Sequence, residues 1–168
     1  EEIISNVLEK SFPKGLAKRY IVRTSPTINE NLQILLKNAE KFYINVNKNL
    51  ELRLELFVTS VNSGHYESSK VMIKWFEEKE TNNEFQLKEM NNHEKYIYAY
   101  FHSAIGYYNL IALSDPVNAN KYFTKAKEII SLVYGYEYLT FNINYQLFGV
   151  LLSLGQVKDA EKAKDALL

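Results

Sequence analysis

Apolar side chains recur along most of this chain with the spacing of an α-helix. The pattern is strongest over residues 98–135, where two amphipathic segments flank a turn at 114–116. In the second segment Ala119, Phe123 and Ala126 share one helical face, so small side chains lie on both sides of a phenyl ring. Small side chains allow a neighbouring helix to approach closely, and the ring fills the space between them. This stretch therefore predicts a helical hairpin that packs against further helices.

The same period predicts helices on both sides of this hairpin. The expected segments are about 29–43, 50–61, 66–78, 94–113, 116–134, 138–154 and 156 onward. Asp115 and Pro116 suit the start of a helix, whereas Gly64 and Gly135 suit its end. Residues 77–92 are polar and acidic and predict a long connection. No sustained two-residue alternation occurs, so the predicted fold class is all-α.

The length of the chain favours one domain spanning residues 1–168. Residues 1–45 are expected to form N-terminal helices, although Pro13 and Gly15 interrupt the first periodic run. The sequence begins with Glu1 rather than Met and stops within a helical run, so we expect a fragment of a longer chain.

Net charge and cysteine content narrow the possible classes of function. Lys+Arg and Asp+Glu are both 20, so no overall field attracts nucleic acid or anionic lipid. Basic residues gather between Lys10 and Arg23, but they match no nucleic-acid-binding motif and are interpreted as a solvated face. Cys is 0, which excludes disulfides and thiolate metal sites. No membrane helix or signal peptide is recognisable, so we expect a cytoplasmic protein with neither a membrane nor a nucleic-acid partner.

The sequence contains no clear catalytic constellation. Of His65, His93 and His102, only His102 lies on a strongly predicted helix, and no ligand-type residue lies one turn away from it. Glu51 and Glu55 are one helical turn apart, where a charged helix face explains them. We therefore predict no enzyme, no metal and no cofactor. The alternative is an enzyme that uses His102 or this carboxylate pair.

A repeated arrangement of turns and small residues links three parts of the chain. A small residue follows a helix turn at Ser69, Ala119 and Ala160. In the first and last of these parts, Gly64 and Gly155 lie five residues earlier. The packing positions continue with Ile73 and Phe76 in the first part, Phe123 and Ala126 in the second, and Lys164 and Leu167 in the third. The three parts therefore favour helical hairpins of one design.

This pattern resembles the tetratricopeptide repeat, which has a glycine at the turn and an alanine–aromatic–alanine set on its second helix. The resembling units cover roughly residues 50–78, 94–135 and 138–168. Their small positions are 50 and 41 residues apart rather than about 34, and Lys164 stands in place of the aromatic residue. The family tryptophan is absent from every first helix. The longer, degenerate helices are similar to the TPR-like domains of peptide-pheromone receptors in low-GC Gram-positive bacteria and their phages.

The resemblance implies a stack of antiparallel helical hairpins in a right-handed superhelix, whose first helices line a concave groove. The groove positions that it implies are Leu54, Val58, Tyr100, Ser103, Tyr107, Asn142, Tyr145 and Gly149. Tyrosine rings and side-chain amides suit an extended peptide. The alternative for each tyrosine is that it packs between helices. These positions carry no cation, so capture of a C-terminal carboxylate is not expected.

The resemblance thus implies a non-catalytic domain that binds a peptide or a protein in its groove, with a homodimer as an additional arrangement. One alternative is the ligand-sensing domain of a peptide-pheromone-responsive transcriptional regulator. In that case a DNA-binding or effector domain would lie elsewhere in the longer chain. The enzyme described above is the alternative from a different class.

Overall fold

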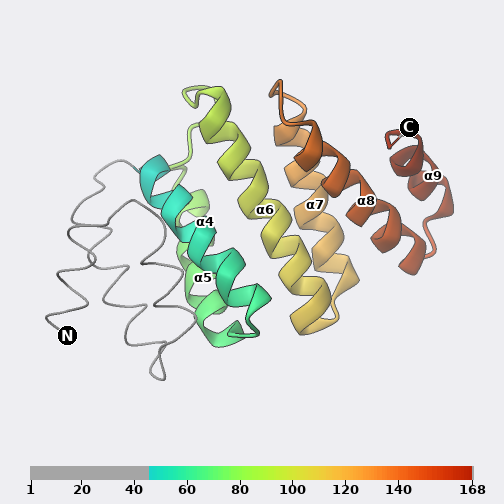
Figure 1. Cartoon of the computed structure of the whole chain (residues 1–168), viewed down its shortest axis with the longest axis horizontal. Coiled ribbons are helices and arrows are strands. Elements are labelled where there is room, and N and C mark those ends of the chain that lie inside the picture. Colours follow the sequence, from blue (N-terminus) through green and yellow to red (C-terminus); the bar gives the residue numbers. More distant parts are fainter. Residues whose placement is uncertain (1–45, 168) are drawn as a thin grey trace, which may run out of the picture. The chain divides into compact units, whose positions relative to one another are not determined.

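The computed structural model describes residues 46–167, and all regular secondary structure in this range is α-helical. The helices are α4 (Val46–Asn62), α5 (Tyr66–Thr81), α6 (Asn92–Leu113), α7 (Pro116–Ile130), α8 (Glu137–Ser153) and α9 (Val157–Asp165) (Figure 1). The predicted all-α class is therefore confirmed for this part of the chain. The helices expected within 1–45 and the basic residues between Lys10 and Arg23 lie outside the described residues.

The chain divides into two compact units, and the boundary follows Phe85. Helices α4 and α5 belong to the first unit, where they pack against each other. Helices α6 to α9 belong to the second unit, where each helix packs against the next one along the chain. Within this second unit α6 also touches α8 (Figure 1).

The core of the first unit contains a positively charged group beside an indole ring. Arg53 of α4 is buried, and its guanidinium carbon lies 4.1 Å from the centre of the Trp75 ring on α5. The attraction between a cation and an aromatic face offsets part of the solvation free energy that the cation loses on burial. Phe85 follows α5 and packs against Phe76 and Trp75, with ring centres 5.4 Å and 6.1 Å away. The polar connection predicted after α5 therefore begins with an apolar anchor.

Two helices of the second unit begin with side-chain caps that the sequence encodes locally. The Asn91 side chain accepts a hydrogen bond from the Glu94 N–H at 3.0 Å, and the Glu94 carboxylate accepts one from the Asn91 N–H at 2.9 Å. This reciprocal pair is a capping box at the start of α6. At the start of α7, Asp115 accepts a hydrogen bond from the Asn118 N–H at 3.0 Å, and Pro116 occupies the first turn. The long polar connection before α6 and the short turn before α7 thus each lead into a capped helix start.

The end of α7 differs from the sequence prediction. The apolar pattern predicted a helix to residue 134 with Gly135 as its stop, but α7 ends at Ile130. Beyond Ile130 the Leu132 and Val133 N–H groups donate to the Ile129 and Ile130 carbonyls, three residues back, so the chain leaves the α-helical pattern for tighter turns. The Ser131 hydroxyl also donates a hydrogen bond to the Glu128 carbonyl at 2.7 Å. Gly135 does adopt a positive φ of 85°, but it lies in the loop before α8.

The helix ends within the three hairpins each pass through a residue with a positive φ. Gly64, Ser114 and Gly155 have φ values of 74°, 52° and 71°, in the left-handed region that ends a helix. In the outer two turns the following residues, His65 and Gln156, have nearly the same conformation, with φ −87° for both and ψ 64° and 62°. The next helix begins directly afterwards in all three cases. The recurrence therefore extends to the middle turn, where serine replaces glycine.

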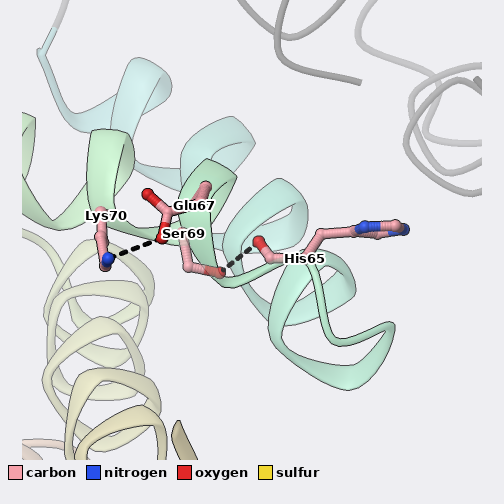
Figure 2. A network of polar contacts seen from close by, with 4 residues as sticks. All are labelled: His65, Glu67, Ser69 and Lys70. Carbon is pink, nitrogen blue, oxygen red and sulfur yellow. Dashed lines mark hydrogen bonds and ion pairs between the residues drawn. The ribbon is translucent and has the colours of Figure 1, made fainter. Parts of the chain in front are cut away.

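Hydrogen bonds make the two glycine turns equivalent. The His65 N–H donates to the Ser60 carbonyl at 2.8 Å, and the Gln156 N–H donates to the Leu151 carbonyl at 2.8 Å. These are the long bonds of a Schellman motif, which satisfies carbonyls at the end of a helix. After the first turn the Ser69 hydroxyl bonds back to the His65 carbonyl at 3.3 Å, and Lys70 pairs with Glu67 at 2.6 Å (Figure 2).

Candidate ligand-binding surface

Helix α8 leaves a row of large side chains open to solvent. Tyr138, Phe141, Tyr145 and Leu152 are exposed by 83%, 51%, 58% and 46%. Their spacing places them on one face of the helix, and the buried side chains of α8 lie on the other side. The rings of Phe141 and Tyr145 are nearly parallel, with an interplanar angle of 9° and centres 6.4 Å apart. Within the described residues this row contacts no other helix strongly enough to bury it.

Helix α6 carries a narrower open row. Tyr107 and Ile111 are exposed by 40% and 41%, and the partly buried Tyr96 and Tyr100 lie along the same side of the helix. The remaining circumference of α6 is mostly buried, which explains why the open row is narrow. We call the open rows of α6 and α8 together the aromatic face.

The two rows meet near the N-terminal ends of α6 and α8. The rings of Tyr96 and Tyr136 stack with centres 4.2 Å apart and an interplanar angle of 18°. Tyr96 also contacts Tyr100, with ring centres 5.9 Å apart. Burial raises the pKa of the Tyr100 hydroxyl, and the neighbouring Tyr138 raises it further. Burial together with Tyr100 and Tyr136 likewise raises the pKa of Tyr96, so the hydroxyls of Tyr96 and Tyr100 stay neutral at physiological pH.

The predicted groove residues fall into different environments. Tyr107 and Tyr145 are exposed, and Tyr100 and Asn142 are partly exposed. Ser103 lies on the same side of α6 as Tyr100 and Tyr107 by helical spacing, but its small side chain is buried. The other predicted groove positions also differ in exposure: Leu54 is buried, Val58 is partly buried and Gly149 is exposed.

Sequence reasoning missed five members of the aromatic face, namely Tyr96, Ile111, Tyr138, Phe141 and Leu152. Tyr96, Tyr138 and Phe141 were not among the expected groove residues, although each is aromatic and accessible to some degree. The helical spacing of residues 138, 141, 145 and 152 could have identified the row on α8. The signal was obscured because α8 is apolar on nearly every side, so its hydrophobic pattern does not distinguish the core from the surface.

The predicted packing residues lie in the interior of the second unit. Ala119, Phe123 and Ala126 of α7 are fully buried, as is Ala160 of α9. A Cβ atom at Gly106 of α6 would lie 3.0 Å from the Phe123 ring. Glycine therefore makes room for the ring between α6 and α7. In the first unit Ser69 is buried after the Gly64 turn.

Formal charge is distributed unevenly over the second unit. No Asp, Glu, Lys or Arg occurs from residue 96 to 113 of α6 or from residue 138 to 153 of α8. The neighbouring helices hold the charges instead: Lys121, Lys125, Lys127 and Glu128 on α7, and Lys158, Asp159, Glu161, Lys162, Lys164 and Asp165 on α9. The aromatic face is thus neutral over almost its whole length.

The candidate catalytic residues are not members of the aromatic face. His102 is buried, and its ring lies 4.9 Å from that of Tyr98 and 6.0 Å from that of Tyr122 on α7. Glu51 and Glu55 belong to the first unit and are partly buried. Among residues 46–167 no three His, Cys, Asp or Glu side chains gather closely enough to hold a metal ion.

Comparisons with models of protein families, with curated proteins and with solved structures find no match to this chain. Across the part of the chain that the structure describes, every helix is too short or too polar to span a bilayer. The likeness to a helical repeat therefore rests on the turns and packing residues of the chain itself.

Proposed function

We propose that this chain is a polypeptide-binding helical-repeat domain in which α4–α5, α6–α7 and α8–α9 are degenerate tetratricopeptide-like hairpins. The recurrent left-handed turns and the small residue after each one support the repeat. In this proposal α6 and α8 are first helices, which face the ligand, and α7 and α9 are second helices. The partner is an extended segment of a peptide or protein.

The observation that carries the binding proposal is the aromatic face. The row of Tyr138, Phe141, Tyr145 and Leu152 lowers solubility, because about half or more of each side chain is open to solvent within the described residues. Tyrosine and phenylalanine rings bring a large contact area with few rotatable bonds, so little conformational entropy is lost when a ligand covers them. The Asn142 amide beside the row can donate to and accept from a peptide backbone.

The test begins with the selection of binders from a displayed library of random peptides on the immobilised chain. Selected peptides are then titrated calorimetrically against the unaltered chain and against Tyr145→Ser. We expect the variant to weaken binding by at least about tenfold, since central aromatic anchors contribute most of the energy of an interface. Val117→Ser is the matched control, because Val117 is equally exposed but lies on α7.

Two results would contradict the proposal. One is a library that yields no binder above background. The other is a set of binders whose affinity is the same for Tyr145→Ser as for Val117→Ser. Circular dichroism of both variants checks that the helices remain intact.

A further inference from the structure

We propose that the segment bound on the aromatic face is uncharged, rich in proline and aliphatic residues, and held without ion pairs. This inference rests on the proposed function and specifies the chemistry of its ligand. It follows from the placement of charge in the second unit, from the hydrogen-bonding groups on the face and from the absence of a free backbone edge on helices.

The neutral face disfavours a charged ligand. Residues 96–113 and 138–153 contain no Asp, Glu, Lys or Arg, and His102 is buried, so a charged ligand group placed over them would lose water without gaining an ion partner. The Tyr96 phenol, whose ring stacks on that of Tyr136, is also neutral at physiological pH, because burial raises its pKa. Such a surface selects against charged segments by the cost of their desolvation.

The groups beside the rings suit the carbonyls of an extended backbone. Tyr107 and Tyr145 present exposed rings that carry hydroxyl groups, and Asn142 adds an amide. A helix uses its own backbone bonds internally and offers no edge to which a strand could be added. A proline-rich segment fits these conditions, because proline has no N–H to satisfy and its carbonyls remain free to accept. Aromatic rows are also the surfaces on which polyproline II segments dock.

The size of the face sets the length of the probe. From Tyr138 to Leu152 the row extends over roughly 21 Å, given a rise of about 1.5 Å per helical residue. A polyproline II chain advances about 3.1 Å per residue, so about seven residues would cover the row. A probe of about ten residues with blocked ends covers it without adding terminal charges.

The experiment uses the binders selected from the random library and measures their salt dependence with the unaltered chain. We expect proline and aliphatic residues at the positions that contact the face, and a Kd that changes less than about threefold between about 50 mM and 500 mM NaCl. A second arm replaces one contacting residue of the blocked probe by Lys or by Glu. Either replacement is expected to weaken binding by at least about tenfold, as burial of an unpaired charge requires.

The outcomes separate this inference from the proposed function. Binders that are sensitive to Tyr145→Ser but carry charges at the contact positions, or lose more than about threefold in affinity with salt, overturn the inference and leave peptide binding intact. Tolerance of both Lys and Glu in the probe overturns it as well. Binders that ignore Tyr145→Ser contradict the proposed function itself.

Discussion

The hairpins α6–α7 and α8–α9 fill the space between their helices in opposite ways. In α6–α7 the second helix supplies the volume, since Phe123 lies against Gly106 on the first helix. When the two hairpin sequences are aligned on Ser114 and Gly155, Leu147 aligns with Gly106 and Lys164 aligns with Phe123. Leu147 is buried and Lys164 is exposed, so in α8–α9 the first helix supplies the volume.

The comparison indicates that each of these two hairpins has one large buried side chain at this point, on the second helix in α6–α7 and on the first helix in α8–α9. A ring on the second helix requires glycine on the first helix, because protein interiors have no room for both a ring and a large aliphatic group at one point. Where the second helix carries lysine, a leucine on the first helix closes the gap. The α4–α5 hairpin has a large aliphatic residue at both positions, with Leu56 buried on the first helix and Ile73 partly buried on the second.

The largest expected loss of stability comes from removing the ring that packs the α6–α7 hairpin. Phe123→Ala should lower the free energy of unfolding by about 3 to 5 kcal/mol, because it removes a fully buried ring and leaves a cavity opposite Gly106. Lys164→Ala, at the equivalent position of α9, should change stability by less than about 0.5 kcal/mol. Urea unfolding of both variants measures the difference, and equal losses would refute the assignment of these two roles.

The next largest expected loss of stability tests the packing of the α8–α9 hairpin. Leu147→Ala should cost about 2 to 4 kcal/mol, because this buried leucine fills the space that a ring fills in the other hairpin. Leu152→Ala serves as the control, since Leu152 is on the open side of α8 and its truncation leaves no cavity. Thermal unfolding should show a clear decrease for the first variant and almost none for the second. Similar melting temperatures would mean that Leu147 is not the packing residue of this hairpin.

A smaller change in stability is expected from a substitution at Gly106, and its sign should depend on the side chain at position 123. Gly106→Ala is expected to destabilise by about 1 to 2 kcal/mol, because crowding of the Phe123 ring at 3.0 Å outweighs a gain in helix propensity of about 1 kcal/mol. In a Phe123→Leu background the same change should be neutral or stabilising. Gly149→Ala on α8 meets no atom within 4 Å and should stabilise in both backgrounds. A double-mutant cycle with no coupling between residues 106 and 123 would disprove the contact.

Substitutions at Ser114 and Gly155, in two of the turns, should change stability by smaller amounts. Ser114→Gly should stabilise by about 1 kcal/mol, because serine has a positive φ there and glycine adopts that conformation without a Cβ penalty. Gly155→Ala should destabilise by about the same amount, since its surroundings are open and only the backbone conformation resists the change. Opposite signs in chemical unfolding are the expected result. Two changes of the same sign would contradict the equivalence of the turns.

The smallest effect separates the aromatic face from the core. Tyr145→Ser should change the free energy of unfolding by less than about 0.5 kcal/mol, because its side chain is exposed by 58% and packs against little but Phe141. A loss of more than about 2 kcal/mol would place Tyr145 in the core and remove the basis for the binding proposal. Urea unfolding measures it beside the core variants.

The local features of the sequence were the easiest to predict. The helical period, the Asp115–Pro116 start of α7 and the left-handed conformation of Gly64 and Gly155 depend on residues close together in the chain. The α7 end was misplaced, since the apolar pattern continues past Ile130 although the backbone hydrogen bonds there tighten to a spacing of three residues. The left-handed Ser114 was also missed, because serine carries no strong signal for that conformation.

The sequence alone determined that this chain is helical, where most of its helices begin and which small residues follow its turns. Tertiary structure decided which side of each apolar helix is covered. Helices α6 and α8 are apolar nearly all round, so only their contacts with α7, α9 and each other distinguish buried Ile105 and Leu147 from exposed Tyr107 and Tyr145. Burial depends on neighbours that are distant in sequence, whereas capping and helical period depend on residues within a turn or two.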